Sequence, residues 1–128
     1  MKPGTFQDLI GVPWAWDGLD PRKALGCYGL LRIVCDRLGL PPFDLADAWR
    51  NAYHFGWRGD VVPDGWFVVD DRPQSGDVLV TRYQGIPRHL SYLLDKRRVL
   101  TSVVRHGVCI LPIERMNTEL HAVVRVDA

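Results

Sequence analysis

Two different hydrophobic periodicities divide this chain near Trp66. Before that residue, apolar side chains recur at helical spacing, most clearly in "CYGLLRIVCDRL". From Trp66 onward come short β-type runs separated by turn formers: "WFVV", "DVLVTRY", "HLSYLL", "RVLTSVV", "VCILPI" and "HAVVRV". Helices followed by consecutive strands predict an α+β fold, with N-terminal helices packed on a C-terminal antiparallel β-sheet. The length of 128 residues fits one domain spanning residues 1–128.

The clearest helix is predicted from Cys27 to Leu38. Cys27, Leu31, Val34 and Leu38 fall on roughly one face, and Gly39 then ends the helix. Weaker patterns predict two further helices, at Thr5–Ile10 and Phe43–Phe55.

The charge balance argues against nucleic acid as a partner. The chain has 16 Lys and Arg against 15 Asp and Glu, and the basic residues are scattered rather than gathered in a stripe. No apolar run approaches the roughly 18 residues of a membrane span. The start, "MKPGTFQDLIGVPWAWDG", lacks the apolar core of a secretory signal. We therefore expect a soluble protein with no membrane span and no Sec signal.

Cysteine and histidine spacings do not indicate a disulfide framework or a metal site. The cysteines form no C-x-x-C pair, and the histidines form no H-x-x-x-H pair. The sequence contains no glycine-rich nucleotide-binding motif. We therefore expect free thiols, no metal and no cofactor. The residues concerned are Cys27, Cys35 and Cys109, with His54, His89, His106 and His121.

Cys27 and His89 are the residues best placed for chemistry. Cys27 lies in the first helical turn, where unpaired N–H groups and the helix dipole favour an anion, so we expect its pKa to be lowered. His89 begins a predicted strand after the turn "GIPR", and an imidazole suits proton exchange with a thiol near neutrality. The alternative is that neither residue is catalytic, because a lone cysteine is often a small buried apolar residue and a lone histidine is often structural.

A series of motifs resembles the NlpC-type cell-wall cysteine peptidases of the papain-like superfamily. In order they are "GVPWAWDG", "LGCYGLLRIVCDRLGL", "PQSGDVLVTR", "RHLSYLLDKRRVLTS" and "GVCILPI", spanning about residues 8–113. The motif "CYGL" and the final predicted strand "HAVVRV" are similar to the corresponding segments of the branch encoded among phage and phage-like tail genes. The resemblance implies the papain-like fold.

The resemblance also implies site residues. Cys27 matches the nucleophile, His89 the general base and Thr101 the third catalytic position, while Gly76–Asp77 matches a turn that opens a strand. The hairpin "YLLDKRRVLTS" turns near Asp95–Arg97, so we expect Thr101 beside His89 on the neighbouring strand.

Three positions depart from the family pattern. Gly26 stands where aspartate is usual, Thr101 where histidine, an amide or an acid is usual, and Trp14 where tyrosine is usual. A threonine hydroxyl can accept the imidazole N–H and fix its tautomer, but it brings no charge to stabilise an imidazolium. We therefore expect a weakened site.

The remaining candidates receive structural interpretations. We expect His106 to be a solvated turn residue, although it lies close enough in sequence to reach the site. His54 and His121 are interpreted as structural or exposed, and Cys35 and Cys109 as inert buried thiols.

The function implied by the resemblance is a phage or phage-like tail-tip cysteine peptidase that cleaves amide bonds of peptidoglycan stem peptides. Its partners would be those peptides and other tail-tip or hub proteins. It would reside in the particle tail, and in the host cytoplasm during assembly, which fits the missing Sec signal. Two alternatives stay open: a structural tail component with a weakened or inactive site, and amidase or acyl-transfer chemistry on the same scaffold.

Overall fold

The structure is a computed structural model that describes residues 3–45, 49, 52, 56–57, 62–117 and 119–127. Its regular elements, in chain order, are the 3₁₀ helix η1 (Pro3–Leu9), strands β1 (Leu19–Asp20) and β2 (Ala24–Leu25), helix α1 (Cys27–Leu38), strands β3 (Trp66–Val69), β4 (Val78–Tyr83), β5 (Ile86–Leu93), β6 (Arg98–Val103) and β7 (Gly107–Pro112), helix α3 (Glu114–Asn117) and strand β8 (Leu120–Val126).

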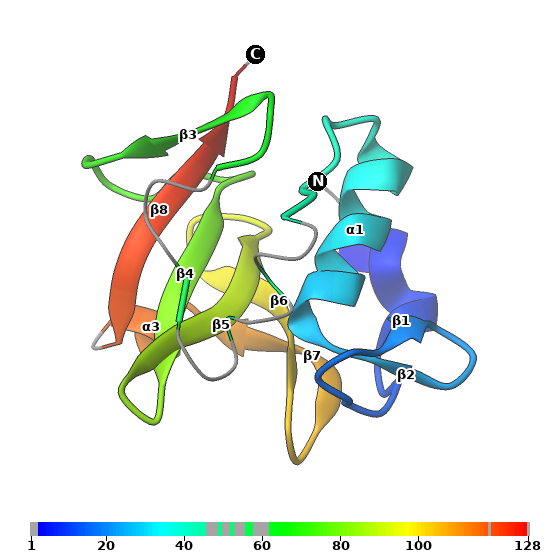
Figure 1. Ribbon diagram of the computed structural model, residues 1–128. Coiled ribbons are helices and arrows are strands. Elements are labelled where there is room, and N and C mark those ends of the chain that lie inside the picture. The colour runs from blue at the N-terminus through cyan, green and yellow to red at the C-terminus, as the bar shows by residue number, and fades with distance from the viewer. Residues whose placement is uncertain are drawn as a thin grey trace.

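The strands of the second half form the main sheet. Within the described residues it has six antiparallel strands in the order β3-β8-β4-β5-β6-β7, and β1 pairs with β2 in a separate antiparallel ribbon. The last strand, β8, lies between β3 and β4 (Figure 1). The predicted α+β class, with N-terminal helical structure on an antiparallel sheet, is confirmed.

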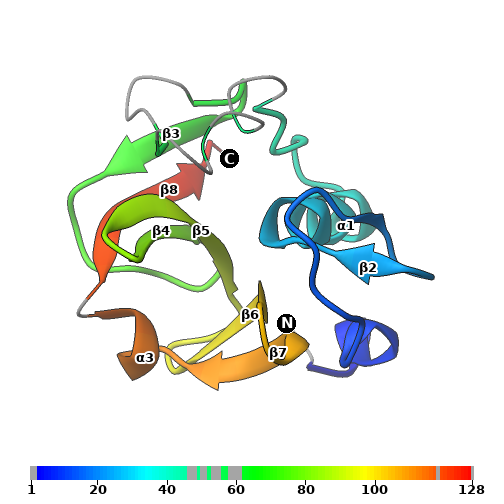
Figure 2. The same ribbon diagram turned by 60° about the horizontal axis from the view of Figure 1, so that its bottom comes forward.

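Helix α1 packs on one side of this sheet. It contacts β5 and β6, and β1 and β2 lie on its outer side (Figure 1). Figure 2 shows the sheet curving around α1. The helix begins at Cys27 and ends at Leu38, as predicted, because Gly39 takes a left-handed conformation with φ 67° and donates its N–H to the helix end.

Strand β4 is buried on both of its faces. Val78 and Val80 belong to the apolar cluster that includes α1, whereas Leu79 belongs to a second cluster with Met116 of α3. Since successive side chains of a strand point to opposite faces, α1 and α3 cover opposite faces of the sheet. The cleft described below receives residues from both helices.

Two β-bulges lie side by side on the two neighbours of β4. Thr81 pairs with His89 and Arg82 with Pro87, so Arg88 is the extra residue of a bulge in β5. Val80 pairs with Ala122 and Thr81 with Leu120, so His121 is the extra residue of a bulge in β8. A bulge bends the strand and redirects side chains, and here both act at the level of His89.

The two weaker helix predictions, at Thr5–Ile10 and Phe43–Phe55, have different outcomes. The segment predicted as a helix at Thr5–Ile10 is the 3₁₀ helix Pro3–Leu9, interrupted at Phe6, whose φ of −120° is not helical. Such a short segment gains little from helix cooperativity, so burial of Phe6 and Leu9 determines its shape. In the predicted helix Phe43–Phe55, Trp49 and Ala52 are helical, and most of the other positions lie outside the described residues. Helix α3 was not predicted.

Candidate active site

Cys27 is held at the start of α1 by a close packing of backbone on backbone. Gly26 precedes it in an extended conformation and donates its N–H to the carbonyl of Gly18 at 3.1 Å. A Cβ atom at Gly26 would lie 2.4 Å from the carbonyl oxygen of Trp16 and 2.6 Å from that of Ala15. The loop therefore leaves no room for a side chain at position 26. This steric restriction explains why glycine stands there rather than aspartate.

His89 lies on β5 beside Thr101 on β6. The Thr101 Oγ1 atom is 2.7 Å from His89 Nε2 and 3.0 Å from the Leu90 carbonyl oxygen. The hydroxyl has one proton, which it donates to the carbonyl, so it accepts the second bond from an Nε2–H group of His89. This tautomer leaves Nδ1 without a proton and able to accept one. Thr101 lies where the hairpin argument placed it.

Cys27 and His89 line the same cleft, which has a volume of about 180 Å³. Trp14 and Trp16, from the loop before β1, line the same cleft. Thr101 is fully buried and does not line the cleft, so it can act only through His89. The structure thus brings the three predicted site residues together, two at the surface of the cleft and one behind them.

The pKa of Cys27 shifts in the direction opposite to the prediction. Burial raises the pKa of the thiol to about 11, although backbone N–H groups of Leu90, Tyr28 and Cys27 act against that rise. Burial also lowers the pKa of His89 to about 4. Loss of solvation outweighs the helix start, because Cys27 is only 4% exposed. Burial therefore favours a neutral thiol and a neutral imidazole in this pair.

Aromatic side chains support the loop and helix around the site. The Tyr28 hydroxyl donates to Asp44 Oδ1 at 3.1 Å and accepts the N–H of Leu45 at 3.1 Å. The Tyr28 ring stacks on Trp49, with ring centroids 5.9 Å apart, and Trp49 stacks on Trp16 at 5.1 Å. This stack connects the residue after Cys27 to a wall of the cleft.

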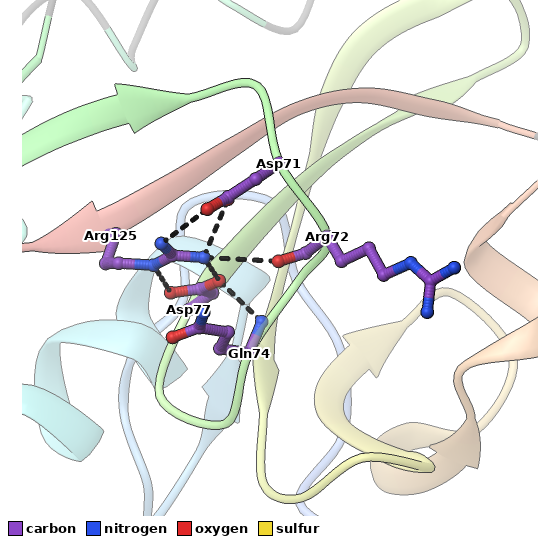
Figure 3. Close-up of polar contacts among 5 residues, drawn as sticks. All are labelled: Asp71, Arg72, Gln74, Asp77 and Arg125. Carbon is purple, nitrogen blue, oxygen red and sulfur yellow. Dashed lines mark hydrogen bonds and ion pairs between the residues drawn. The ribbon is translucent and has the colours of Figure 1, made fainter.

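The turn before β4 is fixed by an ion pair between a buried carboxylate and a partly buried arginine (Figure 3). Asp77, 1% exposed, accepts hydrogen bonds from Arg125 Nε at 2.9 Å and Nη2 at 3.0 Å, and from the Gln74 N–H at 2.7 Å. Arg125 also bonds to Asp71 and to the carbonyl of Arg72, and the carboxylates raise its pKa. The turn at Gly76–Asp77 and the arginine of "HAVVRV" thus form one structural unit, which the sequence analysis did not connect.

The other candidate residues lie away from the chemistry. His106 is exposed in the turn between β6 and β7 and does not line the cleft. His121 is exposed, its Nδ1 is 3.1 Å from Arg82 Nη2, and burial and that guanidinium lower its pKa. His54 lies outside the described residues. Cys35 is buried, with a pKa raised to about 11, whereas Cys109 is only half-buried, so its prediction as a buried thiol is wrong.

Sequence reasoning missed several residues of the cleft. They are Thr81, Arg82, Tyr83, Arg88, Ser102, Val103, Val104, Arg115, Met116 and Glu119. Ser102 is fully buried and donates to the carbonyl of Leu25 at 2.7 Å, which ties β6 to the segment before Cys27. Arg88 follows "GIP" directly before His89, but its place in a bulge depends on pairing with β4, which no local pattern indicates.

Similarity to known proteins is found in structure and not in sequence. No protein-family profile and no curated protein sequence matches this chain. A structure from Staphylococcus aureus subsp. aureus Mu50, described as similar to lipoprotein of the NLP/P60 family, has a TM-score of 0.62 at 17% identity. It covers 100% of this chain, which spans 43% of that chain's length.

The NlpC/p60 domain of the peptidoglycan hydrolase SagA also has a TM-score of 0.62 at 17% identity, covering 96% of this chain and 94% of that domain. At such low identity these likenesses show the fold: the chain has the papain-like α+β fold of NlpC/P60 proteins. Among the described residues, no helix is long and apolar enough to cross a membrane, and no three potential metal ligands are clustered.

Proposed function

We propose that this chain is a single NlpC-type domain, spanning residues 1–128, that hydrolyses amide bonds of peptidoglycan stem peptides with Cys27 as nucleophile. One observation carries the proposal: Cys27 at the start of α1 and His89 line one cleft, and Thr101 holds His89 by a hydrogen bond. The likeness to a peptidoglycan hydrolase domain supports the substrate class.

The first chemical step starts from the neutral pair. The Cys27 sulfur attacks the carbonyl carbon of the amide while its proton passes to Nδ1 of His89, giving a tetrahedral oxyanion. The backbone N–H groups in the first turn of α1 are the natural donors to that oxyanion, and each such donor typically contributes about 3–4 kcal/mol. His89 then gives the proton to the leaving nitrogen, the C–N bond breaks, and a thioester and a free amine remain.

Water completes the turnover. It adds to the thioester carbonyl and passes a proton to Nδ1 of His89, and collapse of the second oxyanion breaks the C–S bond. The sulfur takes the proton back, and the product is a carboxylic acid. Thr101 keeps the ring in one tautomer throughout, but its neutral hydroxyl adds no charge to stabilise the imidazolium. We therefore expect slow catalysis.

A digestion of purified peptidoglycan tests this activity. Wild-type protein should release stem-peptide fragments, and Cys27→Ala should release none. Cys35→Ala is the matched control because Cys35 is a second buried thiol on the same helix, and it should keep the activity. Equal release by wild type and Cys27→Ala would refute the proposal.

A second candidate function is a structural tail-tip component that keeps the fold with little activity. The raised thiol pKa and the uncharged third residue favour it. Absence of any Cys27-dependent product from stem peptides or other amides and esters, by a folded protein, would select this candidate. Cys27-dependent cleavage of amides other than stem peptides would instead select the amidase or acyl-transfer alternative.

We further propose that the protein resides in the tail of a phage or phage-like particle. It is supported by the resemblance of "CYGL" and "HAVVRV" to the tail-gene branch. A particle would carry the enzyme to the cell wall together with other tail-tip or hub proteins, and high local concentration would compensate for a weak site. Fractionation of purified particles tests it: the protein should co-purify with tails, and its presence only in the host cytoplasm would exclude this location.

A further inference from the structure

We infer that the Thr81 hydroxyl is a further catalytic group of the cleft, which binds the water molecule that hydrolyses the Cys27 thioester. This inference rests on the proposed function and deepens it, since it assigns a residue to the second half of the reaction. Three observations on Thr81 carry it: its place opposite His89, its burial in the cleft, and the lack of a partner for its hydroxyl among the described residues.

Thr81 lies directly opposite His89 on the neighbouring strand. The two residues are partners in the register of β4 with β5, and opposite residues of an antiparallel pair point to the same face of the sheet. On the other neighbouring strand, β6, Thr101 binds Nε2 of His89. His89 therefore lies between two threonines, and Nδ1 is the ring nitrogen that remains for the reaction.

The bulges of β5 and β8 meet at Thr81. On the β5 side the register shifts between Thr81 and Arg82, and on the β8 side it shifts between Val80 and Thr81. Bulges interrupt the regular ladder and redirect side chains, and they are common beside active sites. Thr81 is thus the residue of β4 at which the sheet departs from regular pairing on both sides.

Thr81 differs from the other buried serine and threonine residues in its hydrogen bonding. Each of the others bonds within the protein; they are Ser91, Thr101 and Ser102. Thr81 is only 3% exposed, yet its hydroxyl has no hydrogen-bond partner among the described residues. A buried hydroxyl without a partner is costly unless a water molecule or a ligand binds it.

The Thr81 hydroxyl is open to the cleft. Within the described part of the chain, one side-chain nitrogen or oxygen atom is fully enclosed and lacks a partner, and that atom is Nε1 of Trp49. The Thr81 oxygen, which also lacks a partner there, is therefore not fully enclosed. Since Thr81 lines the cleft of Cys27 and His89, its hydroxyl meets the molecule that occupies this cleft.

A single water molecule can bridge Thr81 and His89. Opposite side chains of an antiparallel pair have Cβ atoms about 4.5–5.5 Å apart, which leaves room for a water between their polar ends. A water molecule in a mostly apolar cavity needs at least about two polar partners, and the Thr81 oxygen and Nδ1 of His89 provide them. The cleft, at about 180 Å³, is large enough to hold it beside the acyl group.

The order of the reaction places this water in the second half. During acylation the thiol gives its proton to Nδ1 of His89, so no water is needed there. After the amine leaves, the water gives one proton to Nδ1, and its second O–H donates to the Thr81 oxygen. This bond directs a lone pair of the water oxygen towards the thioester carbon. The new C–O bond forms, the C–S bond breaks, and His89 returns the proton to the sulfur.

An activated ester separates the two half-reactions. The p-nitrophenyl ester of the acyl part of a stem peptide should acylate Cys27 in a burst of p-nitrophenol, and the later steady rate measures hydrolysis of the thioester. Thr81→Val keeps the shape of the side chain and removes the hydroxyl. Its burst rate constant should stay within about threefold of wild type, and its steady rate should fall by about tenfold or more. Mass spectrometry should show more acylated enzyme during its steady phase.

Control variants assign the effect to the hydroxyl. Thr81→Ser keeps the hydroxyl, so both of its rates should stay within about threefold of wild type. Ser91→Ala removes a buried hydroxyl that bonds to Met116 and does not line the cleft, and it should change neither rate. If Thr81→Val does not fold, Thr81→Ala, which adds no atoms, decides in the same assay.

The burst distinguishes this inference from the proposed function. A wild-type burst that is absent in Cys27→Ala, with equal steady rates for wild type and Thr81→Val, would leave Cys27 as the nucleophile and remove the role of Thr81. A parallel fall of both phases in Thr81→Val would also remove it, because a purely structural residue affects both half-reactions. Absence of a burst in wild type would refute Cys27 as the nucleophile, and this inference with it.

Discussion

The hydroxyl of Thr101 determines which nitrogen of His89 carries the proton. Because it donates to the Leu90 carbonyl, it must accept from Nε2–H, and Nδ1 is left as the base. The hydroxyl is fully buried, so no water replaces it if it is lost. The neutral Thr101 side chain can therefore orient the His89 ring, although it brings no charge to stabilise an imidazolium.

Removing the Thr101 hydroxyl should weaken catalysis without unfolding the protein. Thr101→Val keeps the shape but leaves Nε2–H without its acceptor, and we expect kcat to fall roughly tenfold to a hundredfold. Thr101→Ser keeps the hydroxyl and should stay within about threefold of wild type. Steady-state hydrolysis of stem peptides measures both, and equal rates for the valine and serine variants would contradict the role assigned to Thr101.

His89 should make stability depend on pH below neutrality. Its folded pKa of about 4 lies below the unfolded value of about 6.5, so the unfolded chain binds the proton first. The free energy of unfolding contains this contribution in full above about pH 6.5 and loses it as pH falls towards 4, by about 2–3 kcal/mol after allowance for partial exposure. The cations Arg82, Arg88 and Arg115 in the cleft act in the same direction, and Glu119 opposes them.

Urea denaturation at several pH values checks this expectation. The difference between wild type and His89→Gln, which cannot titrate, isolates His89 from the other histidines. Wild type should lose more stability than His89→Gln between about pH 6.5 and 4. Parallel pH curves for the two proteins would show that burial does not depress the pKa of His89.

At the scale of elements, the start of α1 is fixed by contact between two backbone segments. Gly26 lies against the carbonyls of Ala15 and Trp16, and Ser102 binds the carbonyl of Leu25. Together they place Cys27 at the cleft. The helix supplies the direction of its N–H groups, but the loop and β6 supply its position.

A side chain at position 26 should displace Cys27. Gly26→Ala places a Cβ 2.4 Å from a backbone oxygen, so we expect a loss of roughly 1–3 kcal/mol in the free energy of unfolding and a large loss of activity. Gly39→Ala is the control at the other end of α1: its Cβ meets nothing within 4 Å, and the left-handed backbone alone costs about 1 kcal/mol. That variant should keep its activity, and chemical denaturation with peptide hydrolysis measures both.

The ion pair between Asp77 and Arg125 should contribute more to stability than a surface pair. Asp77→Asn removes the buried negative charge that pairs with Arg125 and replaces one acceptor oxygen with an NH2 group, which loosens the turn before β4, so thermal stability should fall. Arg98→Gln breaks the exposed pair with Asp95 and should have little effect. Melting temperatures of the two variants check the order, and an equal shift would contradict the structural role of the buried pair.

At the scale of the whole molecule, local sequence patterns predicted most of the fold. The helical spacing and Gly39 predicted both ends of α1, and alternation with turn formers predicted the strands of the main sheet within a few residues. The short turn near Asp95–Arg97 placed Thr101 beside His89, because a tight hairpin fixes its own register. These features depend on residues close together in sequence, and the sequence by itself determined them.

Tertiary structure decided the chemistry of the same residues. Four features depend on contact between segments that are distant along the chain. They are the direction of the Cys27 pKa shift, the close packing that leaves no room for a side chain at Gly26, the bulge that includes Arg88, and the pairing of Asp77 with Arg125. Burial and register depend on which distant segments pack together, and hydrophobic spacing does not specify that partner. The sequence therefore determined which residues stand near the site, whereas packing determined their charge states and the space around them.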